Sequence, residues 1–295
     1  TGVQTCALPI WAVNAQMPSF RTNASPEYPI QQPKKGDEGQ PAEGRSRSRG
    51  GVRMPTPAFR TEVPDHPVDV ILGRPTGDAI TLSALAYQDL EASVAYGTRP
   101  GAYSNETRRL SLAKGRPVHL LISPLQPDTR YFYQFRCRMS GQTNVLAQAE
   151  STFVTARKPG SSFTFTVQAD PHLDYGTDPE IYRKSLLNAL AAKPDFHMDL
   201  GDTFMTDKYT DYTQATPQYL AQRYYFGLIG HSAPVFLTLG NHDGEQPSQG
   251  GGDRDSLAVW SNTMRKKYFP NPLPNDFYTG NSTPDSRAEI GRAHV

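Results

Sequence analysis

The chain has 295 residues and a formal net charge of +1, with 30 Lys and Arg against 29 Asp and Glu. This balance gives no reason to expect nucleic acid or an anionic membrane as the main partner. No apolar run approaches the roughly 18 residues of a membrane-spanning helix, so we expect no membrane span. A chain of this length can bury a core without disulfide bonds, and its composition leaves the oligomeric state open.

The two ends of the amino-acid sequence do not look as if they were translated from a natural gene. Written with the codons ATC GGA AGA GCA CAC GTC, residues 290–295 have a complementary strand that can encode residues 5–10. Antisense ends of this kind are typical of a translated sequencing adapter flanking an insert. We therefore interpret residues 1–10 and 289–295 as artefacts, and we expect the authentic protein to be truncated at its C-terminal end.

Residues 11–64 predict a disordered leader. The segment is rich in Pro, Gly, Ser, Gln and charge, and it has too few large apolar residues to offset the entropy of ordering its backbone. Val13 to Ala15, before Gln16, has the small-residue form of a signal-peptidase site. This favours a periplasmic or extracellular protein, and an ordinary disordered N-terminus is the alternative.

Residues 65–157 predict an all-β sandwich, because short alternating runs of β-branched and aromatic residues are separated by turn residues. Leu125 to Tyr133 contains a proline turn followed by alternating tyrosines, and it resembles the tyrosine corner of fibronectin type III domains. Cys137, the one cysteine outside the artefact, is expected to be a half-buried strand residue. The predicted strands are 68–72, 79–84, 92–96, 119–122, 131–138 and 151–155.

Residues 161–288 predict an α/β domain with a parallel sheet, since strand and helix patterns alternate. Asp178 followed by Pro179 is a helix N-cap with proline at the first helical position. The last strand is a continuous apolar run, which is typical of a strand covered on both faces. The predicted elements are strands 163–169, 196–200 and 235–239 and helices 178–192 and 218–230.

A polar cluster follows each of the three predicted strands of the α/β domain. Because the carboxyl ends of parallel strands meet at one edge of a sheet, we expect the three clusters to converge. Carboxylate, imidazole and amide groups together suit Mn, Fe or Zn. Singly, each residue could be an ordinary turn or cap residue, and the joint pattern favours a metal site. The clusters are Asp170-Pro171-His172, Gly201-Asp202 and Gly240-Asn241-His242-Asp243.

In this order, Asp-x-His, Gly-Asp and Gly-Asn-His-Asp resemble the first three motifs of the calcineurin-like metallophosphoesterase superfamily. With a fibronectin-like domain in front, the layout is similar to that of purple acid phosphatases. The resemblance implies a β-sandwich followed by a truncated α/β metallophosphoesterase sandwich domain. It also implies two divalent or trivalent metal ions, Mn, Fe or Zn, with a bridging hydroxide that attacks a phosphate ester.

The resemblance also assigns roles to individual residues. Asp170 and His172 are expected to bind the first metal, Asp202 to bridge both ions, and the Asn241 carbonyl to bind the second. Asn241 and His242 are expected to contact the substrate phosphate. His242 is the expected catalytic group that stabilises charge or protonates the leaving oxygen, with Asp243 orienting its ring.

The sequence also departs from the purple acid phosphatase pattern. Those enzymes have glycine in place of His172 and a metal-binding tyrosine in place of Met205, so we predict a colourless enzyme. The family's later histidines, a lone His and then Gly-His-x-His, have no counterpart, because His294 is the only histidine after His242 and lies in the artefact. We therefore expect the fragment to bind its second metal poorly and to be inactive.

The leading hypothesis is that the complete parent protein hydrolyses phosphate monoesters or diesters. The alternative is a non-catalytic surface-binding or partner-binding protein with a relic phosphoesterase domain. We expect structural roles for His197 and His231, and a surface excursion near the active-site mouth for residues 260–280.

Overall fold

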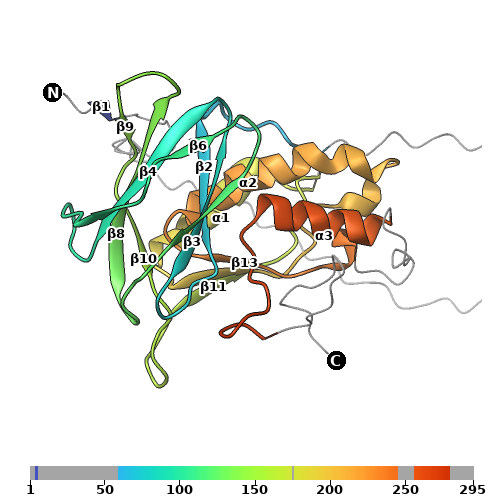
Figure 1. Ribbon diagram of the computed structural model, residues 1–295. Helices are drawn as coiled ribbons and strands as arrows, with labels where there is room; N and C mark the ends of the chain where they lie inside the picture. Colours follow the sequence, from blue (N-terminus) through green and yellow to red (C-terminus); the bar gives the residue numbers. More distant parts are fainter. Residues whose placement is uncertain (1–3, 6–58, 175, 245–255, 280–295) are drawn as a thin grey trace, which may run out of the picture.

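The computed structural model describes residues 4–5, 59–174, 176–244 and 256–279. Strands of the first half form a β-sandwich, and the second half adds helices and a small parallel sheet beside it (Figure 1). The predicted order of an all-β part followed by an α/β part is therefore confirmed. Among the described helices, none combines the length and apolar character needed to cross a membrane.

Two antiparallel sheets make up the sandwich. One has the order β2-β3-β7, and the other is built on the pair β4 and β8. All six predicted strands are present, within two residues at each end, and β5, β6 and β9 were missed because they are only two or three residues long. The strands are β2 Val68–Gly73, β3 Ile80–Ala86, β4 Leu90–Gly97, β5 Asn105–Glu106, β6 Leu110–Leu112, β7 Val118–Ile122, β8 Arg130–Met139, β9 Leu146–Ala147 and β10 Ser151–Val154.

The tyrosine corner forms as the sequence predicts. The Tyr131 hydroxyl accepts a hydrogen bond from the Gln126 backbone N–H at 2.8 Å, which fixes the turn before β8. Tyr131 also stacks on Phe153 in the core, with ring centroids 5.3 Å apart. Cys137 is buried in this core rather than half-buried, because its side chain faces the opposite sheet.

The α/β part contains a three-stranded parallel sheet with the order β11-β12-β13. Asp178 caps helix α1, where its carboxylate accepts from the N–H groups of Glu180 and Ile181 at 2.8 and 3.3 Å. Helices α1 and α2 pack on each other and on the sheet face that carries His197. The elements are β11 Phe165–Gln168, α1 Pro179–Ala191, β12 Phe196–Asp199, η1 Thr206–Lys208, η2 Tyr212–Ala215, α2 Thr216–Gly230, β13 Val235–Leu237, η3 Asn241–Asp243 and α3 Leu257–Tyr268.

The other face of this sheet is apolar and partly exposed. Phe165 and Val167 of β11 are 47% and 50% exposed, and the strand register places Met198 and Phe236 on the same face. Phe163, Phe165 and Phe196 form a row of neighbouring rings. Among the described residues, the sheet is therefore covered by helices on one face only, unlike our prediction for its last strand.

The prediction of a surface excursion over residues 260–280 is wrong for residues 260–272, whereas residues 273–279 are mostly exposed and residue 280 lies outside the described residues. Helix α3 buries Met264, Arg265 and Tyr268, and Phe269 follows in the same core. Asn271 then pairs with the backbone of Leu237, accepting from its N–H at 3.1 Å and donating to its carbonyl at 3.0 Å. The Asn271 side chain thus pairs with the backbone N–H and carbonyl groups of Leu237 in β13, as a neighbouring strand would.

The sandwich and the α/β part share a core. Ile71 and Leu85 of the sandwich pack with Phe226 of α2 and with residues of β13 and α3. Arg223 is fully buried at this junction, where its guanidinium donates to the Ser83 hydroxyl at 3.0 Å and to the Tyr268 carbonyl. A buried guanidinium is tolerated only with several acceptors, so Arg223 ties the two parts together.

The described residues before the sandwich also contact the α/β part. The Arg60 N–H donates to the Leu173 carbonyl at 2.6 Å, and Phe59 stacks on Tyr209 at 4.9 Å. Residues 11–58 of the predicted leader and residues 280–295, which include the C-terminal artefact, lie outside the described residues. The predicted domain boundaries stay predictions.

Candidate metal centre

The first predicted cluster lies on the loop after β11. Asp170 and Leu173 both have positive φ angles, 59° and 55°, which side chains other than glycine rarely adopt. The Asp170 N–H donates to the Gly201 carbonyl at 3.0 Å, which holds this strained loop against the loop after β12. Strain of this kind is concentrated at functional sites, where surrounding contacts maintain it.

The second and third clusters approach each other closely through two glycines. A Cβ atom on Gly201 would lie 2.0 Å from the Gly240 nitrogen, and one on Gly240 would lie 2.2 Å from the Asp202 nitrogen. With no side chains in the way, the His242 N–H reaches Asp202 and donates to its Oδ1 at 2.8 Å. The Gly-Asp and Gly-Asn-His-Asp motifs thus form one compact pair of loops.

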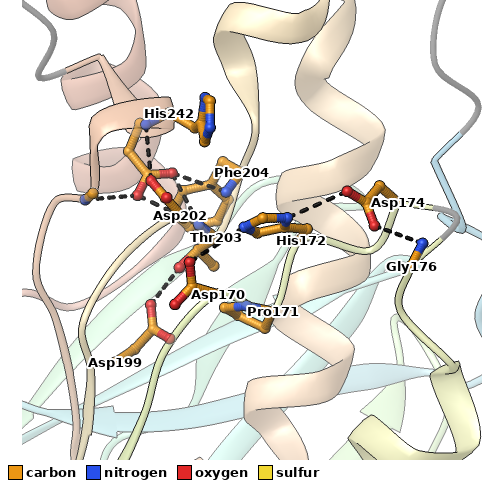
Figure 2. A network of polar contacts seen from close by, with 12 residues as sticks. Asp170, Pro171, His172, Asp174, Gly176, Asp199, Asp202, Thr203, Phe204 and His242 are labelled. Atoms are coloured by element: carbon orange, nitrogen blue, oxygen red, sulfur yellow. Dashed lines mark hydrogen bonds and ion pairs between the residues drawn. The ribbon is translucent and has the colours of Figure 1, made fainter. Parts of the chain in front are cut away.

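Asp170, His172 and Asp202 come together at this edge of the sheet (Figure 2). Each offers one ligand atom, and these atoms lie within 4.8 Å of one another. The Nε2 of His172 lies 3.4 Å from Oδ1 of Asp170, is shielded from solvent, and has no hydrogen-bond partner among the described residues. An orphaned imidazole nitrogen facing carboxylates fits a metal ion, which would supply the missing partner.

Asp174 supports His172 and was missed in the sequence. Its Oδ2 lies 3.2 Å from His172 Nδ1, and its Oδ1 accepts from the Gly176 N–H at 2.9 Å (Figure 2). A carboxylate on one ring nitrogen fixes the tautomer and leaves the other nitrogen free to bind metal. The Asp-Pro-His-Leu-Asp spacing was visible, but only the loop geometry shows that Asp174 turns back toward the ring.

The structure corrects the role predicted for Asp243. Its carboxylate accepts from the backbone N–H groups of Thr203 at 3.1 Å, Phe204 at 2.9 Å and Gly240 at 3.0 Å. Successive residues of a 3₁₀ turn point in different directions, so Asp243 faces inward and not toward the ring of its neighbour His242. Burial raises the pKa of Asp243, and these N–H groups offset that effect.

Asp207 takes the place beside His242 that we expected Asp243 to occupy. The Nδ1 of His242 lies 2.8 Å from Oδ2 of Asp207. The His242 ring lies 6.1 Å from the ring of His172, close to the three-residue cluster. Asn241 is exposed at the start of η3, and its predicted metal and substrate contacts stay predictions.

A second buried carboxylate lies under the cluster. Asp199 is fully buried, and this burial raises its pKa to about 7. The Thr203 hydroxyl and the Gln168 amide donate to it, the latter at 3.1 Å. Because Thr203 follows Asp202 directly, Asp199 anchors the loop that carries Asp202 (Figure 2).

Residues 163–286 match the family model described as calcineurin-like phosphoesterase. The second part of the chain is therefore similar to calcineurin-like phosphoesterase domains. The match begins just before β11, and its range contains all three motif clusters. No curated protein sequence matches the chain.

Two solved structures illustrate the similarity of this chain to known proteins. The purple acid phosphatase PPD1 from yellow lupin (Lupinus luteus) seeds is 16% identical, with a TM-score of 0.50 over 72% of this chain and 42% of the lupin chain. PhoD is 14% identical, with a TM-score of 0.48 over 78% of this chain and 50% of that chain. The chain therefore spans about half the length of these proteins, and the likeness concerns the fold alone.

The remaining predicted residues of the α/β part are His197, His231 and Met205, which the three-residue cluster does not include. His197 is buried in β12, and His231 ends α2 beneath the sandwich, where the Tyr133 hydroxyl donates to its carbonyl at 2.6 Å. Their positions agree with the structural roles we expect. Met205 is buried, with a positive φ of 44°. The predicted lack of colour stays a prediction.

Proposed function

We propose that this domain hydrolyses phosphate esters, monoesters or diesters, with bound metal ions. The observation that carries the proposal is the meeting of Asp170, His172 and Asp202, in which Nε2 of His172 has no hydrogen-bond partner among the described residues. These residues come from two strand ends of a domain that matches the calcineurin-like phosphoesterases. Their side chains would hold the first ion, and Asp202 and the Asn241 carbonyl would contribute to the second.

The donor set is one that Mn, Fe or Zn accept. Bound metal ions supply a water nucleophile of lowered pKa and neutralise the phosphoryl oxygens. The exposed side chain of Asp170, 64% accessible, leaves this edge of the sheet open to a phosphate ester. The cluster therefore combines buried support on one side with access on the other.

His242 has the geometry of a group that acts on the substrate. Its Nδ1 faces Asp207, which leaves Nε2 for a phosphoryl oxygen or for the leaving oxygen. As the imidazolium, His242 donates from Nε2, and Asp207 balances the charge. General acid catalysis of this kind contributes about 10²- to 10⁴-fold to a rate.

The catalytic activity, the number of bound metal ions and the cellular location are proposed for the complete protein. The chain spans about half the length of the similar structures, and we expect this chain alone to bind its second ion poorly and to be inactive. We also propose that the complete protein is exported. The pattern at Val13 to Ala15 supports this proposal and lies outside the described residues.

The test compares metal content and hydrolysis. The chain and its His172→Ala variant are stripped with a chelator, then incubated with Mn²⁺ or Zn²⁺, and bound metal is measured per chain. Asp89→Asn, an exposed substitution in the sandwich, is the matched control. We expect wild type and Asp89→Asn to retain metal and His172→Ala to lose it; equal retention by all three rejects the site.

Hydrolysis of 4-nitrophenyl phosphate and bis(4-nitrophenyl) phosphate is then measured on the metal-loaded complete protein. Cleavage of either ester that disappears in His172→Ala supports the proposal. If the loaded protein cleaves neither ester, the alternative of a non-catalytic binding protein stands.

A further inference from the structure

Gln222 links the two metal-binding loops from beneath. It lies in the middle of α2, is fully buried, and donates from Nε2 to the Pro171 carbonyl at 2.6 Å and to the Thr203 carbonyl at 2.9 Å. Pro171 stands between Asp170 and His172, and Thr203 follows Asp202 directly (Figure 2). One amide group therefore holds both loops that carry the cluster.

The amide of Gln222 is itself fixed in orientation. The Tyr182 hydroxyl donates to its Oε1 at 2.9 Å, so the oxygen faces α1 and the NH₂ group faces the loops. Gln168 contacts the Tyr182 hydroxyl at 3.3 Å and donates to Asp199, which in turn accepts from the Thr203 hydroxyl. The contacts close a ring through Gln222, Tyr182, Gln168, Asp199 and Thr203.

This ring connects four elements, β11, β12, α1 and α2, directly under the cluster. Networks in which every member has a partner hold a unique geometry, and a member that loses its partners is costly in a buried site. Gln218, one helical turn earlier on α2, donates to the His172 carbonyl at 2.6 Å. Two glutamines at i and i+4 thus present amide donors from one face of α2 to the loops.

We propose that Gln222 is a positioning residue of the metal centre: it sets the separation between the loop of Asp170 and His172 and the loop of Asp202. The inference rests on the proposed metal site and deepens it. Without the amide, the two loops keep their own contacts but lose their common support, and the ligand atoms spread beyond the reach of one ion. Partners that orient metal ligands typically change metal affinity 10- to 100-fold.

An ordinary buried glutamine that only satisfies two carbonyls would behave differently. Its loss would lower the thermal stability of the domain without a specific effect on metal affinity. Metal affinity must therefore be measured beside stability, with a variant that destabilises α2 elsewhere. Leu228 provides this control, because it is buried in the core between α1 and α2 and belongs to the same helix.

The experiment uses the whole chain, with Mn²⁺ alone as the probe. The Kd for Mn²⁺ is measured by titration calorimetry and the Tm by circular dichroism, for wild type, Gln222→Met, Leu228→Ala and Tyr182→Phe. Gln222→Met keeps the side-chain volume and removes both donors. Tyr182→Phe removes only the hydroxyl group that orients the Gln222 amide. This variant tests the inference if Gln222→Met does not fold.

We expect Gln222→Met to raise the Kd for Mn²⁺ at least tenfold and Tyr182→Phe to raise it less. Leu228→Ala should lower the Tm with an unchanged Kd. An unchanged Kd in both Gln222→Met and Tyr182→Phe overturns the inference while leaving the metal site intact. The inference is also overturned if Leu228→Ala loses Mn²⁺ affinity in proportion to its loss of Tm. Wild type that binds no Mn²⁺ rejects the proposed metal site itself.

Discussion

The Nδ1 of His242 lies 2.8 Å from Oδ2 of Asp207, although 35 residues separate them in sequence. The side chains are 19% and 12% exposed, so the contact is shielded from water. The Lys208 ammonium lies 3.6 Å from the same carboxylate oxygen. Because a carboxylate only accepts hydrogen bonds, the contact keeps a proton on Nδ1 and fixes the plane of the ring.

Asp207→Asn is expected to lower the kcat of the complete, metal-loaded protein by about 10²-fold, because the substitution removes the charge that stabilises the His242 imidazolium. KM should change much less, since Asp207 does not face the metal cluster directly. The measurement is steady-state hydrolysis of bis(4-nitrophenyl) phosphate. Asp211→Asn, an exposed substitution on the neighbouring η2 segment, is the control and should keep the wild-type kcat.

The contact can also be observed without turnover. In wild type, the Nδ1 proton of His242 should give a downfield NMR signal because it is held in a hydrogen bond to Asp207. Loss of that signal in Asp207→Asn, with the other histidine signals unchanged, confirms the pairing. A wild-type kcat in Asp207→Asn means that the ring is oriented by something else.

Asp243→Asn is expected to destabilise the domain rather than to affect His242 directly. The Asp243 carboxylate accepts three backbone N–H groups from two loops, and an amide would turn an NH₂ group toward at least one of them. Leaving buried donors without an acceptor costs about 1–3 kcal/mol, more near charge. Urea unfolding should show this loss. A kcat that falls while the free energy of unfolding stays constant would restore the ring-orienting role.

The sequence predicted the parts of the site that depend on chain order. Strand ends in a parallel sheet meet at one edge whatever the loops do, so Asp170, His172 and Asp202 could be placed together from periodicity and motif spacing. The tyrosine corner was predictable for a similar reason, because the bond from Gln126 to Tyr131 is local.

Contacts set by loop conformation could not be predicted. The chain between Asp202 and Asp207 passes through positive φ angles at Asp202 and Met205, and Asp207 then contacts His242. The partners of Gln222 are backbone carbonyl groups, which carry no sequence signal. Helix α3 was missed because its contacts with the shared core are long-range.

Gly240→Ala is expected to disrupt the metal site. A Cβ atom at this position would lie 2.2 Å from both the backbone nitrogen and the Oδ1 of Asp202, closer than any relaxed contact. The loops must separate, which breaks the bond from the His242 N–H to Asp202. We expect a loss of several kcal/mol in the free energy of unfolding, similar to other severe overpacking.

Gly77→Ala is the matched control for Gly240→Ala. Its added Cβ would meet only Pro127, at 3.6 Å, which is ordinary van der Waals contact. Thermal unfolding and Mn²⁺ titration should therefore give wild-type values for Gly77→Ala and losses in both for Gly240→Ala. If Gly240→Ala unfolds and binds Mn²⁺ as wild type does, the two loops are not held as closely as the structure shows.

His197 is expected to make the fold sensitive to acid. Burial lowers its pKa from the ordinary value of 6.5 to about 4, and its Nδ1 lies 2.8 Å from the Thr166 hydroxyl. Between these pH values the unfolded chain takes up a proton that the folded chain excludes. The stabilisation is therefore complete above pH 6.5 and is lost as pH falls toward 4, by roughly 3 kcal/mol at most.

His197→Gln can keep the hydrogen bond to Thr166 and cannot titrate. Urea unfolding at pH 7.5 and pH 4.5 should show a smaller loss of stability for this variant than for wild type. The loss should not vanish, because burial also lowers the pKa of His231 to about 3. An identical pH dependence in wild type and His197→Gln means that the folded protein accepts a proton on His197.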